Sequence, residues 1–130
     1  MSFTFILLTM FFMHVLDDYV LQAPALCNLK QKNFWEKNAP EKPYRFDYIV
    51  ALIMHAISWS FMIMLPCAFA LSFNIGLGFA LCFILNTAVH ATVDHLKANV
   101  RVINLWVDQT IHLIQIMITF MVFYFGVFVC

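Results

Sequence analysis

Four long apolar stretches alternate with polar connections along the chain. They cover the approximate ranges 3–23, 46–72, 76–98 and 103–129. About 20 apolar residues suffice for one helical crossing of a bilayer, so each stretch is long enough to span it. Only a short uncharged turn separates the second stretch from the third. The pattern therefore predicts an all-α, polytopic membrane protein, a four-helix transmembrane bundle formed as one domain by residues 1–130.

The composition strengthens this prediction. Of the 130 residues, 64% are hydrophobic and 11% are charged, whereas soluble domains are about 45–50% apolar and about 25% charged. A water-soluble fold is excluded, and the length leaves room for four or five helices at most. The apolar run from Phe3 to Leu16 has no basic segment before it and no small-residue cleavage site after it. It is expected to remain as the first helix.

The cationic residues predict the orientation. All seven Lys and Arg residues lie in two segments, 28–45 and 97–101, which follow the first and third apolar stretches. Four consecutive crossings place these two connections on the same side of the membrane. The positive-inside rule assigns that side to the cytoplasm. We therefore expect a multi-pass protein of the cell inner (cytoplasmic) membrane with a cytoplasmic loop at 28–45 and both termini outside.

Each predicted helix also carries polar residues where apolar ones are expected. They are His14, Asp18 and Gln22 in the first helix, His55 in the second, Asn86, His90 and Asp94 in the third, and Asn104, Asp108, His112 and Gln115 in the fourth. A spacing of four residues keeps side chains on one helix face. At about 1.5 Å per residue, the four histidines lie at similar depths. The sequence predicts a histidine layer above an aspartate layer, open toward the cytoplasm.

Buried carboxylates need compensation. An Asp at the centre of a membrane helix costs roughly 2.5–3.5 kcal/mol, and no cation is expected in the same layer. Protonation or a bound metal would remove the charge. Imidazole and carboxylate together suit zinc, with manganese, iron or nickel as alternatives. The predicted metal ligands are His14, Asp18, His55, His90, Asp94, Asp108 and His112. Interhelical hydrogen bonding alone and a proton or ion relay are the competing explanations.

Four motifs carry a family resemblance. They are HxxxDxxxQ at 14–22, the lone His55, HxxxDxxK at 90–97 and DQxxH at 108–112. In combination they resemble the family of small bacterial and phage membrane proteins catalogued as domain of unknown function 3307. The resemblance implies that these residues form one site, and it implies no particular reaction or substrate. By helical phase, Asp17 is expected to point away from this site, and His95 is expected to be interfacial.

The first functional hypothesis is a metal-dependent hydrolase that acts on a lipid or another amphiphile at the cytoplasmic leaflet. Asp18, Asp94 and Asp108 would be ligands or, in one case, the general base. Lys97 would contact an anionic headgroup, although a Lys at this position also suits simple snorkelling. Membrane lipid and a lipid-like substrate are the expected partners, and no nucleic acid is expected.

Two other hypotheses remain open at the level of sequence. A metal-ion or proton transporter would use the same residues as a pathway, but the polar residues are confined to one half of the membrane. A phage-type effector that binds a membrane partner has no need of four matched histidines. A homo-oligomer is also expected, because the small residues from Gly76 to Ala80 permit close helix packing.

Overall fold

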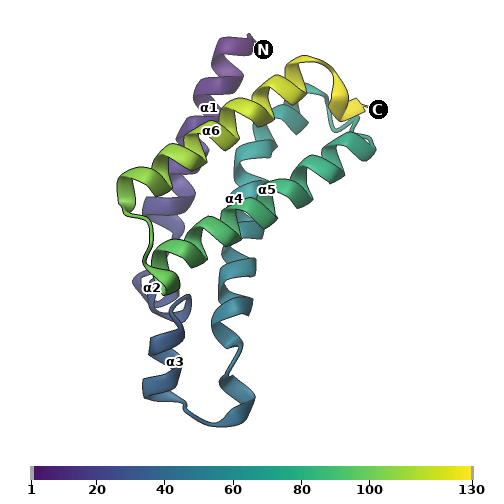
Figure 1. The fold of residues 1–130 in the computed structure, drawn as a ribbon. Helices are drawn as coiled ribbons and strands as arrows, with labels where there is room; N and C mark the ends of the chain where they lie inside the picture. The colour runs from purple at the N-terminus through teal and green to yellow at the C-terminus, as the bar shows by residue number, and fades with distance from the viewer. Residues whose placement is uncertain (1, 130) are drawn as a thin grey trace.

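The computed structural model describes residues 2–129, and every regular element within them is helical. Four helical segments are long and apolar enough to cross a membrane. They are Phe3–Leu21, Lys42–Ala70, Leu77–Val100 and Leu105–Tyr124. These segments pack side by side (Figure 1). The predictions of an all-α fold and of four long apolar helices are confirmed.

The first and third of these segments each end in a π-helical turn. Helix α1 (Phe3–Val15) continues directly into η1 (Leu16–Leu21), and α5 (Leu77–His95) continues into η3 (Leu96–Val100). In η1 the Gln22 N–H donates to the Asp17 carbonyl at 3.0 Å, the i→i+5 bond that defines such a turn. A π-helical turn changes the direction in which successive side chains project. Both turns adjoin the predicted His and Asp positions.

The other two long helices are α4 (Asp47–Ala70) and α6 (Leu105–Tyr124). The prediction that the last helix continues to about residue 129 is wrong. Gly126 has a positive φ of 76°, a conformation that glycine adopts without steric cost and that commonly ends helices. The chain then turns into the short 3₁₀ helix η4 (Val127–Val129), which packs on α5.

This C-terminal turn uses the small residues at the start of α5. The Gly76 N–H donates to the Phe128 carbonyl at 2.7 Å. A Cβ atom added at Gly78 would collide with the Val127 carbonyl oxygen. Gly78 therefore serves packing within the chain, whereas this stretch was expected to serve contacts between copies.

The polar connection between α1 and α4, expected as a loop, is largely helical. It contains α2 (Pro24–Leu29), α3 (Lys32–Asn38) and the 3₁₀ turn η2 (Lys42–Tyr44). Trp35 holds it together, because its indole N–H donates to the Leu29 carbonyl at 2.8 Å and its ring stacks on Tyr44. This connection forms one end of the molecule, and both termini lie at the other (Figure 1).

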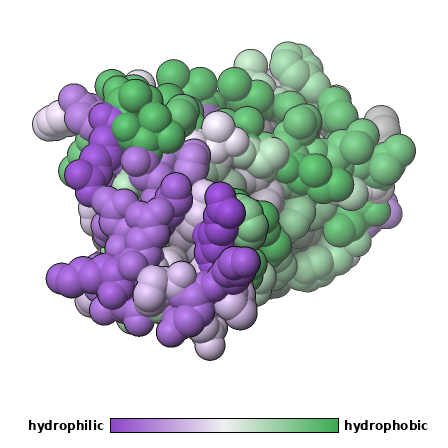
Figure 2. Space-filling view, turned by 60° about the horizontal axis from the view of Figure 1, so that its bottom comes forward, coloured by the Kyte–Doolittle hydropathy of each residue, from purple (hydrophilic) through white to green (hydrophobic). Residues whose placement is uncertain are grey.

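The polarity of the surface also differs between the end that carries this connection and the rest of the molecule. Hydrophilic side chains gather at the end that carries the connection, and hydrophobic side chains cover the flank beside it (Figure 2). Leu85 and Ile118 on the long helices are 65% and 59% exposed. Cys67 is buried in the apolar core, and Cys27, Cys67 and Cys82 are free thiols. Cys130 lies outside the described residues.

Candidate metal centre

The four predicted histidines meet in the interior, each from a different long helix. The ring centroids of His90 and His112 are 4.2 Å apart, those of His55 and His90 are 5.1 Å apart, and those of His14 and His112 are 6.0 Å apart. All four side chains are buried. The prediction that these histidines share one layer is confirmed. Four residues from separate helices thus form one cluster.

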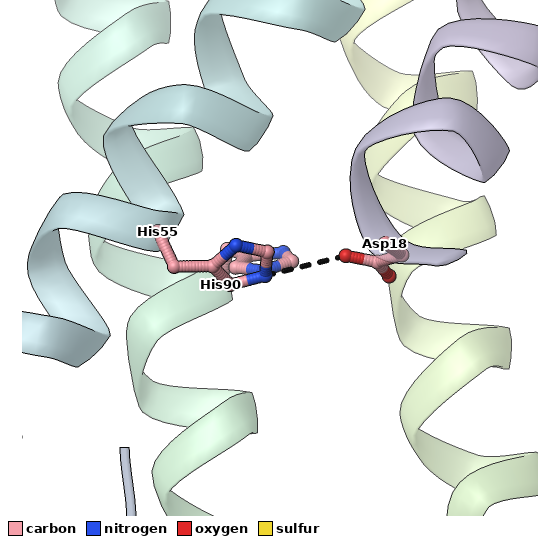
Figure 3. A group of neighbouring side chains, drawn as sticks. All are labelled: Asp18, His55 and His90. Atoms are coloured by element: carbon pink, nitrogen blue, oxygen red, sulfur yellow. Dashed lines mark ion pairs between the residues drawn. The ribbon is translucent and has the colours of Figure 1, made fainter. Parts of the chain in front are cut away.

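Two carboxylates approach the imidazole nitrogens. Asp18 Oδ1 lies 3.3 Å from His55 Nε2, and Figure 3 shows this contact beside His90. Asp94 Oδ2 lies 3.7 Å from His55 Nε2 and 3.8 Å from His90 Nε2. Asp94 Oδ1 lies 3.8 Å from His112 Nε2. Asp94 therefore bridges three of the four histidines.

These contacts define two possible three-ligand groups. One is Asp18, His55 and His90, and the other is His90, Asp94 and His112, each with its donor atoms within 4.8 Å of one another. Two ligands of a tetrahedral zinc ion at 2.0–2.1 Å lie about 3.4 Å apart. Small side-chain movements would bring either group to that spacing. His90 belongs to both groups.

His90 is the least satisfied polar side chain of the cluster. It is fully buried, and neither ring nitrogen has a hydrogen-bond partner among the described residues. A buried donor or acceptor left without a partner costs about 1–3 kcal/mol, and such a group in a native structure requires an explanation. His112 Nε2 and Asp108 Oδ1 are also buried and unpartnered in this part of the chain. All these atoms face the same small interior region.

Hydrogen bonds fix the tautomer of His112. The Gln115 amide nitrogen donates to the carbonyl and to the side-chain oxygen of Asn86, both at 3.2 Å. The Gln115 oxygen therefore accepts from His112 Nδ1, at 3.2 Å. With its proton on Nδ1, a neutral His112 turns a bare lone pair on Nε2 toward Asp94. That arrangement is repulsive unless a cation lies between the two groups.

His14 has a different environment. Its Nδ1 accepts from the Trp59 indole N–H at 2.9 Å, and its Nε2 lies 3.1 Å from the Gln109 side-chain oxygen. The Gln109 amide nitrogen donates in turn to Asp108 Oδ2 at 3.0 Å and to Asp18 Oδ2 at 3.4 Å. Both nitrogens of His14 are thus hydrogen bonded. His14 and Asp108, both predicted as ligands, adjoin the two three-ligand groups without belonging to either.

The expectation that no cation shares this layer is wrong. The Lys30 ammonium group comes from the end of α2, is buried, and lies 2.6 Å from Asp94 Oδ2. The Lys97 ammonium group, which is partly exposed, lies 2.7 Å from Asp108 Oδ2. Lys30 was expected in a cytoplasmic loop, but the helical connection folds it back into the cluster. Two ammonium groups thus offset part of the negative charge.

The expectation for Asp17 is also wrong. Asp17 is 1% exposed, its Oδ1 accepts from the Ser58 hydroxyl at 2.7 Å, and its Oδ2 lies 3.6 Å from His55 Nδ1. The π-helical turn that begins at Leu16 brings both Asp17 and Asp18 toward α4, whereas regular α-helical phase would separate them. His95 lies away from the cluster, as expected, and stacks on Tyr48.

Trp59 and Lys30 are the principal residues of this site that sequence reasoning missed. Trp59 is fully buried, stacks on His90 with 4.3 Å between ring centroids, and bonds to His14. Its position four residues after His55 is a signal that could have placed it on the same face. No comparable signal marks Lys30, because its burial depends on how the connection folds.

No family model, curated protein or solved structure matches the chain. The resemblance to the domain of unknown function 3307 family stays a prediction based on the four sequence motifs.

Proposed function

We propose that this is an integral membrane protein whose His/Asp cluster binds a divalent transition metal, foremost zinc, and hydrolyses a lipid-like substrate at the cytoplasmic leaflet. Membrane insertion is supported by the four long apolar helices and their exposed apolar flanks. The two connections that contain every Lys and Arg would lie in the cytoplasm of a bacterial or phage-infected cell, and both termini would lie outside.

The observation that carries the metal proposal is the His90 imidazole, fully buried and without a partner on either nitrogen among residues 2–129. Interhelical hydrogen bonding alone would require these nitrogens to be paired. A metal at the junction of the two three-ligand groups would give one ring nitrogen of His90 a partner and could also be bound by Asp18, His55, Asp94 and His112. Imidazole and carboxylate donors are ligands that zinc commonly takes.

The charge of the cluster supports the same proposal. It contains four carboxylates and two ammonium groups, namely Asp17, Asp18, Asp94 and Asp108 with Lys30 and Lys97. With neutral histidines, two negative charges remain in a largely buried space, which is strongly unfavourable. One divalent cation would neutralise them. Protonation of two histidines would achieve the same balance, and metal analysis separates these explanations.

A divalent ion in such a site acts as a Lewis acid and activates water for hydrolysis. The protein would supply the proton acceptor and the headgroup contact. Asp108 Oδ1 is buried, lies 3.5 Å from His112 Nε2 and has no hydrogen-bond partner in the described part of the chain, so Asp108 suits the general base. It would accept a proton from the attacking water and return it to the oxygen of the leaving group as the ester bond breaks. Lys97, partly exposed, would hold an anionic headgroup.

Two surface features support an amphiphilic substrate on the cytoplasmic side. A pocket of about 140 Å³ reaches Asp17 and His55 between apolar walls that include Leu21 and Met54. A second hollow of about 260 Å³ at the polar end is lined in part by Lys32, Lys42 and Arg45. Cations near a membrane surface attract anionic lipid headgroups. An ester with an anionic head and an apolar tail matches both features.

The transporter hypothesis finds less support. The half of the bundle beyond the histidines contains an apolar core that includes Met10, Ile63, Cys67 and Phe128, all fully buried. A transport pathway needs polar groups or water along its whole length. Those side chains pack where such a path would continue.

The test is the metal content of the purified protein, measured by mass spectrometry with and without prior chelation. The parent should retain about one transition-metal ion per chain, and His90→Ala and Asp94→Asn should weaken metal binding by at least about tenfold. His95→Ala is the matched control and should bind metal like the parent. Equal metal content in the parent and in His90→Ala would overturn the metal site.

Activity is then measured on loaded protein with phospholipids and isoprenoid phosphates. Asp108→Asn should keep its metal and lose most of the hydrolysis, as expected for a general base, which contributes roughly 10²–10⁴-fold. If metal-loaded parent protein cleaves none of these esters, the hydrolase proposal is wrong. The metal-site proposal is unaffected by that result.

A further inference from the structure

Two consecutive carboxylates approach opposite edges of one imidazole ring. Asp17 Oδ2 lies 3.6 Å from His55 Nδ1, and Asp18 Oδ1 lies 3.3 Å from His55 Nε2. Adjacent residues of an α-helix project about 100° apart and rarely share a target. The π-helical turn Leu16–Leu21, with its i→i+5 bond from Gln22 to Asp17, makes this arrangement accessible. The two carboxylates thus have distinct positions relative to one histidine.

The surroundings of Asp17 favour a proton on His55 Nδ1. The Ser58 hydroxyl, three residues after His55 on α4, donates to Asp17 Oδ1 at 2.7 Å. Asp17 Oδ2 is buried and has no hydrogen-bond partner among the described residues. A proton on His55 Nδ1 would point toward this oxygen across 3.6 Å, a few tenths of an ångström beyond ordinary hydrogen-bonding distance. A proton on Nδ1 leaves the Nε2 lone pair facing Asp18 and the Gln22 side-chain amide, which lies 3.4 Å from Nε2.

His112 at the far side of the cluster has the same arrangement. Its Nδ1 donates to the Gln115 oxygen, and its Nε2 faces Asp94. Histidines that ligate metals usually donate their second ring N–H to a carboxylate, a carbonyl or water, which fixes the tautomer and makes the ligating nitrogen more basic. Asp17 and Gln115 stand in that position behind His55 and His112.

We infer that Asp17 is a positioning residue: it orients His55 through Nδ1 and presents Nε2 to the metal, while Asp18 acts as a ligand on the other edge of the ring. This inference rests on the proposed metal site and assigns Asp17 a role that its sequence position does not suggest. The Ser58 hydroxyl holds the Asp17 carboxylate in place.

The first test measures the His55 tautomer by ¹⁵N NMR on metal-free, histidine-labelled protein, with His55→Gln used to assign the signal. The parent should carry the proton on Nδ1, and Asp17→Ala should shift His55 toward the Nε2–H tautomer. Asp17→Asn should retain the parent tautomer in part, because its amide oxygen can still accept. An unchanged tautomer in Asp17→Ala would overturn the inference, and this measurement does not depend on metal binding.

The second test measures zinc or cobalt affinity of the full-length protein in detergent. Asp17→Ala should bind about 10- to 100-fold more weakly than the parent, the range typical for a residue behind a ligand, with unchanged stoichiometry. Asp47→Asn, an Asp outside the cluster at the start of α4, is the control. Ser58→Ala should weaken binding less than Asp17→Ala does, and it provides the measurement if Asp17→Ala does not fold.

If Asp17→Ala binds zinc or cobalt as tightly as the parent does, Asp17 has no positioning role. A parent that binds no metal would overturn the proposed function and the ligand role of His55, whereas the NMR result would still decide whether Asp17 orients the ring.

Discussion

The two halves of the helical bundle are stabilised by different means. The half near the α1–α4 connection buries charged and polar groups, among them Asp94, His90 and Lys30. The half near the termini packs apolar side chains such as Met10, Ile63 and Phe128. Buried charge is costly in a protein interior and apolar packing is not. Replacing a buried charged network by an apolar core is often neutral or stabilising, so the polar half is the more costly way to hold the same helices together.

The largest effect is expected from removing one cation of the polar half. Lys30→Met leaves Asp94 buried without its partner at 2.6 Å. Breaking a buried pair in this way costs about 3–5 kcal/mol. The free energy of unfolding in bicelles, measured after chelation, should fall by that amount. Added zinc should restore part of the loss, because the ion can neutralise Asp94.

Lys32→Met is the control for this variant. Lys32 is exposed and pairs with Glu36 at 3.4 Å on the surface of α3, and exposed pairs contribute at most about 1 kcal/mol. Equal losses for the two variants would show that Lys30 is no more important than a surface cation, and the contrast between the two halves would lose its electrostatic basis.

The contrast between the halves also marks what sequence could predict. Hydropathy and the four-residue spacing of His and Asp predicted the long helices and the convergence of the four histidines, because both follow from regular helical geometry. The position of Asp17 depends on a π-helical turn, which hydrophobic periodicity does not reveal. The burial of Lys30 depends on the tertiary path of the connection. The positions of these two residues depend on backbone geometry and tertiary folding, which the local sequence pattern does not encode.

The end of the fourth helix illustrates the same limit. Residues 125–129 are apolar and continue the hydropathy of α6, so sequence predicted a longer helix. Gly126 with its positive φ ends it instead, and Phe128 becomes fully buried in the apolar half. Hydropathy measures suitability for an apolar environment, and it does not distinguish a helix from a turn that is packed inside.

An intermediate effect is expected in the apolar half. Ile63→Ala removes a fully buried side chain from this core. Lipid is as apolar as the side chain, so the loss is mainly of packing contacts, and we expect the low end of the usual range, about 2 kcal/mol. Ile53→Ala on the same helix, with a side chain that is 44% exposed, is the control and should cost much less. Metal affinity should not change in either variant, and a loss of metal in Ile63→Ala would mean that the halves are coupled.

The smallest effect is expected at the boundary between the halves. The Asn86 amide donates to the Thr119 hydroxyl at 2.8 Å, and Asn86 also binds Gln115, the partner of His112. Thr119→Val keeps the shape and removes this bond together with the weaker one that the Thr119 hydroxyl donates to the Asn86 side-chain oxygen at 3.2 Å. Hydrogen bonds between membrane helices contribute about 0.6 kcal/mol on average, and Asn86 keeps weak sulfur acceptors in Met64 and Cys82. The free energy of unfolding should therefore fall by about 0.6 kcal/mol.

The zinc affinity of Thr119→Val tests how far the polar half extends toward the termini. In Thr119→Val the Gln115 amide can still donate to the Asn86 carbonyl at 3.2 Å and hold His112 Nδ1. The affinity for zinc should thus fall by less than about tenfold, the smallest loss typical of a residue directly behind a ligand. Thr92→Val is the control, because the exposed Thr92 hydroxyl bonds only within its own helix. If Thr119→Val loses tenfold or more while Thr92→Val does not, the orientation of His112 depends on the whole chain from Thr119 through Asn86 and Gln115. The functional half of the bundle would then extend one layer deeper toward the termini than the histidines themselves.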